Sequence, residues 1–108
     1  MPQDKLYDIL WTELADLSYQ QELDFINVKF NIDEVIKFMD LVSAFINKLE
    51  SGIVEGRISK TTNMRSFVIS KQTTLFFDIY EDRMVIELLL FWNNQKDPEN
   101  LKGILKNT

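Results

Sequence analysis

The stretch RMVIELLLFWNNQKDPENL, residues 83 to 101, contains the most apolar run of the chain and decides its fold. From residue 84 to residue 92 both alternating faces are apolar except at Glu87, which predicts a central strand covered on both sides. Strict alternation places the even-numbered apolar side chains on one face: Met84, Ile86, Leu88, Leu90 and Trp92. The amides, lysine and Asp97-Pro98 that follow predict a turn, or a short final helix capped by Asp97.

Three shorter segments of period two precede this strand and are separated by polar turns. They cover residues 57–62, 64–70 and 74–80. Strands this close in sequence pair as antiparallel hairpins, so a meander of three or four strands is expected. Phe76 and Phe77 are neighbours in it and should point to opposite faces, so at least one of them lies in the core.

A short strand and a helix are expected at the beginning of the chain. Residues 5–11 alternate loosely, and Thr12 is suited to cap a helix that runs to about Phe30. Its apolar face is widened by further residues, which predicts a helix buried along much of its girth: Leu14, Leu17, Phe25 and Val28. This helix also carries four acids, for which the spacing predicts a solvated face rather than a metal site: Glu13, Asp16, Glu22 and Asp24.

A second helix is indicated more sharply. Asn31 followed by Glu34 is an Asn-capped form of the capping box, and apolar residues then recur at helical spacing as far as Leu49. Gly52 is available to end the helix. The predicted class is therefore α+β, in the order β-α-α-β-β-β, with both helices packed on one face of an antiparallel meander.

Composition narrows the functions that are open to this chain. With 108 residues, of which 45% are apolar, we expect a single domain spanning residues 1–108. The absence of Cys and His removes disulfides, thiolate metal sites, a cysteine nucleophile and the commonest general base, and no metal or cofactor is expected. No stretch resembles a membrane span or signal peptide, so we expect a cytoplasmic protein without a membrane partner.

Charge is unevenly distributed along the chain. The formal net charge is −5, yet residues 51–108 carry eight basic and seven acidic side chains. Four of these cations lie in a segment without any acid, so that a local positive surface is expected on an acidic protein: Arg57, Lys60, Arg65 and Lys71. The alternative is an ordinary row of exposed side chains on two strands.

The whole chain resembles the RelE/ParE superfamily of toxins from bacterial type II toxin–antitoxin pairs, which includes plasmid stabilisation proteins. ILWTELADLSYQQELDFI is similar to their opening strand and first helix, and VIKFMDLVSAFINKLESG to their second helix with its terminal glycine. RSFVISKQTTLFFDIYEDRMVIELLLFWNNQKDPENL resembles their closing meander and Asp-Pro tail. The meander is the most specific part of the resemblance.

The resemblance implies one of two activities, which require different residues. RelE-like members are ribosome-dependent mRNA endonucleases (mRNA interferases) that use clustered Lys and Arg with a Tyr, or a His-Tyr pair, near the last strand. Here Arg65 stands at the matching arginine, Lys71 lies nearby and Lys96 lies near the tail arginine. Trp92 stands where His is common, however, and Tyr80 ends a different strand. The catalytic residues are thus unknown, and whether the chain is an enzyme stays open.

ParE-like members bind and poison DNA gyrase without a catalytic site, and this activity is favoured here. The candidate target-binding residues are Arg57, Lys60, Arg65, Lys71, Trp92, Asn94 and Lys96. Trp92 has a second interpretation as a core residue, and Asn-Asn before Asp-Pro is also ordinary turn chemistry.

The resemblance also implies partners and growth inhibition. A cognate antitoxin would neutralise the toxin, and the target would be gyrase or the ribosome with its mRNA. Assembly as a homodimer, or as a heterotetramer with the antitoxin, stays open. A non-toxic relic that only binds the antitoxin is the third alternative.

Overall fold

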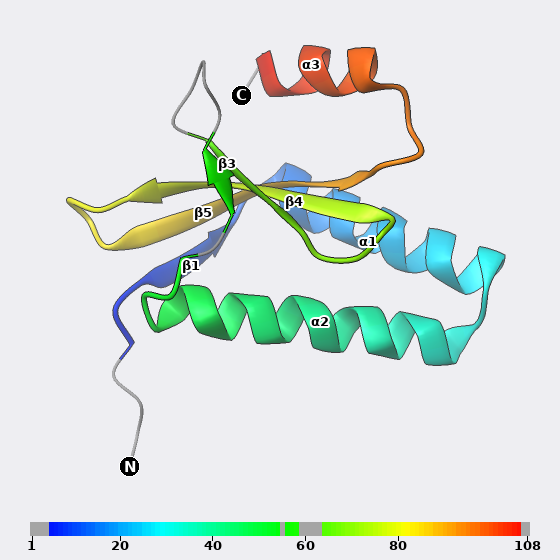
Figure 1. Cartoon of the computed structure of the whole chain (residues 1–108), viewed down its shortest axis with the longest axis horizontal. Helices are drawn as coiled ribbons and strands as arrows, with labels where there is room; N and C mark the ends of the chain where they lie inside the picture. The colour runs from blue at the N-terminus through cyan, green and yellow to red at the C-terminus, as the bar shows by residue number, and fades with distance from the viewer. Residues whose placement is uncertain (1–4, 55, 59–63, 107–108) are drawn as a thin grey trace.

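The computed structural model describes residues 5–54, 56–58 and 64–106. A five-stranded sheet with the order β1-β5-β4-β3-β2 lies between two helices on one face and a third helix on the other (Figure 1). The strands are β1 (Asp8–Trp11), β2 (Arg57–Ile58), β3 (Arg65–Val68), β4 (Thr73–Tyr80) and β5 (Val85–Asn93). The helices are α1 (Glu13–Lys29), α2 (Ile32–Glu50) and α3 (Pro98–Lys106).

The predicted α+β class and the order of the elements are confirmed. Four strands follow the helical hairpin, and β2 through β5 are antiparallel neighbours. Of the segment 57–62, the first two residues form β2, and residues 59–63 lie outside the described part of the chain.

The strand β5 is central, as its apolar pattern predicts. It pairs in parallel with β1, where Asp8 lies opposite Val85, and antiparallel with β4 on its other side. At the start of the ladder with β1, the Asp8 amide donates a hydrogen bond to the Met84 carbonyl at 3.0 Å. The first and last strands of the chain are therefore neighbours in space, and helices cover both faces of β5.

A bulge interrupts the ladder between β4 and β5. Phe76 lies opposite Leu90 and Phe77 opposite Leu88, so Leu89 is an extra residue on β5. An extra residue reverses the alternation of every side chain beyond it. The two halves of β5 therefore present their even-numbered side chains to opposite faces of the sheet.

The expected single face of even-numbered side chains is thus wrong. Ile86 and Leu88 lie in the core beneath α1 and α2, whereas Leu90 and Trp92 lie in a smaller cluster on the face that carries α3. We call this smaller group the α3-side cluster; its buried members are Leu89, Leu90 and Trp92. The expectation for the Phe pair is confirmed, because Phe77 is in the main core and Phe76 packs against the α3-side cluster.

Both predicted helix starts are confirmed by their caps. The hydroxyl oxygen of Thr12 accepts from the Ala15 amide at 3.0 Å, and the side-chain oxygen of Asn31 accepts from the Glu34 amide at 3.0 Å. Gly52 follows the second helix with a φ of +90°, a conformation that glycine adopts without strain. The helical hairpin therefore begins and ends where its sequence signals lie.

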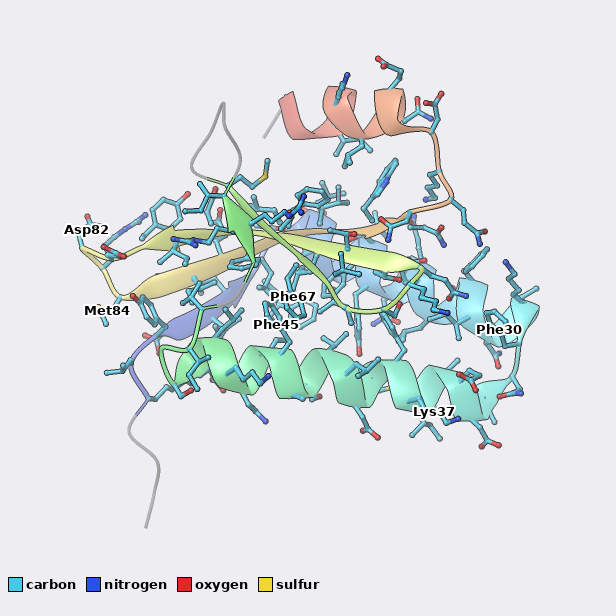
Figure 2. The ribbon with its side chains drawn as sticks, in the orientation of Figure 1. Phe30, Lys37, Phe45, Phe67, Asp82 and Met84 are labelled. Atoms are coloured by element: carbon cyan, nitrogen blue, oxygen red, sulfur yellow. The ribbon has the colours of Figure 1, made fainter. Side chains whose placement is uncertain are left out.

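The main core fills the space between the helical hairpin and the sheet. Phe45 of α2 stacks on Phe67 of β3 with ring centroids 4.1 Å apart, and the two labelled residues lie side by side between α2 and the sheet in Figure 2. Phe45 also meets the edge of Phe77, whose side chain is fully buried. Such offset and edge-on contacts add to the free energy gained by burying the rings.

The first helix is less buried than its sequence predicts. Leu17 is 55% exposed and Val28 is 87% exposed, because only one side of α1 meets the sheet and α2. The expected widening of its buried face is therefore wrong at Leu17 and Val28. It is confirmed at Leu14 and Phe25, which are partly buried against the α3-side cluster and the main core, respectively. Its buried residues form a single row at helical spacing: Ala15, Ser18, Glu22 and Ile26.

The third helix covers the opposite face of the sheet. The amide of Glu99 donates to the Asp97 side chain at 3.0 Å, which confirms Asp97 as the predicted cap. Leu101 and Ile104 pack against the α3-side cluster. Among the described residues, no helix combines the length and the apolar character that a membrane span requires.

Candidate functional site

The predicted site residues at the end of β5 lie where the strand leaves the sheet. Trp92 lies opposite Thr74 of β4 and is only 6% exposed, so its interpretation as a core residue is confirmed. Its ring is part of the α3-side cluster, on which Leu101 and Ile104 rest. Trp92 thus supports the surface around it and offers little area of its own.

Three polar residues surround this end of β5, and we call them the tail surface: Lys71, Asn94 and Lys96. Asn94 accepts a hydrogen bond from the Thr74 hydroxyl at 2.8 Å and donates to the Lys71 carbonyl at 3.4 Å. The ammonium of Lys96 lies 5.7 Å from the centroid of the Trp92 ring, a cation–π distance. All three residues are exposed, so the structure brings them together as an accessible polar surface.

The remaining predicted cations are not gathered at the tail surface. Arg57 lies opposite Ser66, and Arg65 lies opposite Phe77, on the strands at the other edge of the sheet. Residues directly opposite each other share a face, and successive residues of a strand alternate between faces. Arg57 and Arg65 therefore lie on opposite faces, and Lys60 is outside the described residues.

The tyrosine considered for acid–base chemistry lies at the wrong end of the sheet. Tyr80 is opposite Val85, whereas the tail surface adjoins the pair of Thr73 and Asn93 at the far end of the same ladder. Burial, with a smaller contribution from Asp78, raises the pKa of the Tyr80 hydroxyl above its usual value near 10.0. A phenol with a raised pKa stays protonated at neutral pH and does not serve as a base there.

Sequence analysis missed a buried polar group between α1 and the sheet. Glu22 is 4% exposed, and its two carboxylate oxygens accept from the Thr73 hydroxyl at 2.8 Å and the Asn93 amide at 3.2 Å. The expected solvated face is therefore wrong for Glu22, although the other three acids of α1 are exposed. The helical spacing of Glu22 could have predicted its burial, because Glu22 lies in the same helical row as Ala15 and Ile26.

A hollow opens beside this carboxylate, between α1 and the end of β5. Its volume is about 410 Å³, and its lining includes Glu22, Phe25, Phe91, Gln95 and Lys96. In the described part of the chain no three acidic side chains come close enough together to hold a metal ion. We call this feature the Glu22 hollow.

A solved structure has the same arrangement of elements. It is a chain of "Chromosomal ParDE TA system from P. aeruginosa", with a TM-score of 0.67 and 15% identity, and the match covers 82% of this chain and 96% of that one. This chain therefore shares its fold with a chain of a ParDE TA system. At this identity the likeness establishes the fold alone. No family model and no curated protein matches the sequence.

The tail surface on this fold is chemically suited to binding. Two exposed ammonium groups and an amide can attract and orient a polar partner. The surface contains none of the side chains that most often exchange protons with a substrate, which are His and the carboxylates. The arrangement therefore favours recognition over proton transfer.

Proposed function

We propose that this chain is a cytoplasmic, ParE-like toxin domain that binds and poisons DNA gyrase and is neutralised by a cognate antitoxin. The fold likeness to a chain of a ParDE TA system supports the toxin part of the proposal. One observation carries the choice of target. The tail surface presents Lys71, Asn94 and Lys96 without a tyrosine, and the chain has no histidine.

A binding toxin needs only a rigid surface with suitable charge. Asn94 is fixed by two hydrogen bonds to the hairpin between β3 and β4, and Lys96 lies over Trp92. An endonuclease would need a base for the ribose hydroxyl and an acid for the leaving oxygen. The tail surface, as defined by Lys71, Asn94 and Lys96, contains no Tyr, His or carboxylate for these two roles.

The test is to induce this chain alone in bacteria and to follow DNA and protein synthesis by pulse labelling. We expect DNA synthesis to fall first, and the purified chain to inhibit DNA supercoiling by gyrase. Replacing Lys71 and Lys96 together by Ala should relieve both effects. Lys37→Ala, on the exposed outer side of α2, is the matched control and should remain toxic.

The other outcomes separate the alternatives. Early loss of protein synthesis with cleaved mRNA would replace the proposal with a ribosome-dependent endonuclease. If neither synthesis changes, the toxin proposal fails and a binding module without toxicity takes its place. Far-UV circular dichroism of each variant shows whether a lost effect reflects a lost surface or a lost fold.

A further inference from the structure

Three lysines from separate elements are tied to the short segment that follows β5, residues 94–96. Lys96 belongs to this segment, and the Asn94 side chain donates to the Lys71 carbonyl at 3.4 Å. The third is Lys29, in the last turn of α1, whose ammonium donates to the side-chain oxygen of Gln95 at 3.4 Å. The cationic surface therefore extends from the tail surface onto the end of α1.

The charges of these three lysines are not neutralised by partners. All three residues are exposed, and in the described part of the chain none of them forms an ion pair, whereas Lys37 is paired with Glu34 at 3.2 Å. The ammonium of Lys29 lies 5.4 Å from the ring centroid of Phe25, and that of Lys96 lies over an indole. Neutral partners hold an ammonium in place and leave its charge available to a ligand.

The acids near this segment lie away from the three ammonium groups or are already engaged. Glu22 is 4% exposed, and both of its oxygens accept hydrogen bonds below the surface. Asp97 accepts from an amide in the first turn of α3 as its cap. Asp24 comes five positions before Lys29, which places it about 140° away around α1. A local excess of positive charge results at this end of the sheet.

The sheet holds the backbone of residues 94–96 in a fixed geometry. The Asn94 amide donates to the Gln72 carbonyl at 2.6 Å. The amides of Gln95 and Lys96 both donate to Asn93, at 2.9 Å to its side-chain oxygen and at 3.0 Å to its carbonyl. A ligand that binds here therefore has few protein groups left to order, which favours affinity.

The charge pattern favours an acidic protein segment over a nucleic acid. Nucleic-acid affinity depends on many phosphate contacts along a backbone, and a chain with a net charge of −5 repels a long polyanion beyond these few cations. A short run of carboxylates matches a small group of ammonium groups in size. The side-chain nitrogen of Gln95, whose oxygen faces Lys29, can donate to the same carboxylates.

We propose that Lys29, Lys71 and Lys96, arranged around residues 94–96, bind the carboxylates of an acidic segment of a partner protein. The inference deepens the proposed function and rests on it in one respect, because it takes the tail surface as the surface that meets the target. It adds Lys29 to that surface and names the chemistry of the segment that the surface binds.

The test is an NMR titration of the full chain with capped hexaglutamate, a measurement that needs no gyrase. We expect saturable shifts of the amides of Lys29, Asn94, Gln95 and Lys96, and no saturable shift with capped hexaglutamine. An oligothymidylate of equal charge should bind more weakly than hexaglutamate. Each of the variants Lys29→Gln, Lys71→Gln and Lys96→Gln should weaken peptide binding about threefold at low salt.

The matched control is Arg83→Gln. It removes the same charge from the exposed turn between β4 and β5, at the opposite end of their ladder from Asn93, and should leave the affinity unchanged. Far-UV circular dichroism of each variant confirms that the fold is retained, which is expected because all four side chains are exposed.

Several results would overturn the inference. Equal binding of hexaglutamine would show that charge is irrelevant, and equal or tighter binding of the oligothymidylate would assign the surface to nucleic acid. An unchanged affinity in Lys29→Gln, or an equal loss in Arg83→Gln, would remove Lys29 from the site, and the absence of any saturable shift with hexaglutamate refutes it.

The proposed function and this inference fail in different ways. Peptide binding by a chain that does not inhibit gyrase would overturn gyrase as the target and leave the acidic-segment site standing. Gyrase inhibition by a chain that does not bind the peptide would support the proposed function and refute the inference.

Discussion

Val42 and Val28 are the same side chain on neighbouring helices in opposite environments. Val42 is 2% exposed in the main core, and Val28 is 87% exposed on the outside of α1. Removing two buried methyl groups loses transfer free energy and leaves a cavity, so Val42→Ala should lower the free energy of unfolding by about 2 kcal/mol. Val28→Ala should change it by less than about 0.5 kcal/mol. Urea denaturation of both variants checks this, and equal effects would contradict the assigned burial.

Asp78 lowers the free energy of unfolding by an amount that depends on pH. Burial raises the pKa of its carboxyl above the usual 3.8, and Glu87 lies directly opposite on β5. A raised folded-state pKa means that the stabilisation by the protonated form is complete below pH 3.8 and is lost as the pH rises through the folded value. At neutral pH, the ionised Asp78 therefore destabilises the fold.

Asp78→Asn should accordingly raise the free energy of unfolding at pH 7 by about 0.5 kcal/mol, the size of a cross-strand charge pair. The gain should shrink as the pH is lowered towards 3.8, because Asp78 then binds a proton and loses its charge. Urea midpoints at several pH values measure it. Asp82→Asn, on the exposed turn seen at the end of the β4–β5 hairpin in Figure 2, is the control. A gain that persisted at the acid end would refute the assignment.

At the scale of the elements, the capping residues of α1 and α2 differ in the hydrogen bonds that they make outside their own helix. Thr12 caps α1 and also donates from its hydroxyl to the Leu88 carbonyl of β5 at 2.8 Å, whereas Asn31 is exposed and caps α2 only. We expect Asn31→Ala to cost about 1 kcal/mol and Thr12→Ala about 2 kcal/mol. Thr12→Ser retains the hydroxyl and should cost much less. Thermal unfolding ranks the three variants, and equal costs for the two alanines would show that the bond to β5 contributes nothing.

The helix ends were predictable from sequence because a cap is a local device. Thr12, Asn31 and Asp97 each act on an amide two or three residues away, so the signal and its effect lie in one short window. The bulge at Leu89 was not predictable, because it exists only in the pairing of β5 with β4. The burial of Glu22 was missed for the same reason, since its partners Thr73 and Asn93 lie far along the chain.

Among the described side chains of α3, two attach the helix to the sheet. Leu101 and Ile104 are partly buried against the α3-side cluster, which contains Trp92. Replacing both by Ala should cost about 1 kcal/mol, less than a single fully buried leucine, and should expose the indole. In a Trp11→Phe background, we expect red-shifted emission and stronger acrylamide quenching of Trp92. Lys102→Ala, an exposed position of the same helix, should leave both unchanged, and unchanged emission in the double variant would contradict this docking.

At the scale of the whole molecule, the order of elements and the helix-covered face were predictable, and the site was predictable only in part. The apolar pattern of β5 correctly predicted a central strand, because burial on both faces leaves a mark in one segment. Residues from distant parts of the sequence that meet in space need not share any pattern in the sequence. Lys71 and Asn94 meet through a hydrogen bond across 23 positions, while Arg57 and Arg65, closer in sequence, lie on opposite faces.

Because β5 contributes to both the main core and the α3-side cluster, the two faces should unfold together. Leu88 is fully buried on the main-core face, and Trp92 reports from the other face of the same strand. In the Trp11→Phe background, Leu88→Ala should cost roughly 3 to 4 kcal/mol and shift the urea midpoints of Trp92 fluorescence and far-UV circular dichroism equally. The slope with urea should stay unchanged, since the surface exposed on unfolding is the same.

The control is Leu10→Ala on the edge strand β1, where the side chain is 52% exposed and should cost less than about 1 kcal/mol. Two midpoints that separate in Leu88→Ala would contradict a single cooperative unit. The direction of the separation would then be informative. A Trp92 transition left at its original midpoint would mean that the end of β5 and α3 hold together after the helical hairpin has melted, whereas an earlier Trp92 transition would mean that α3 detaches first.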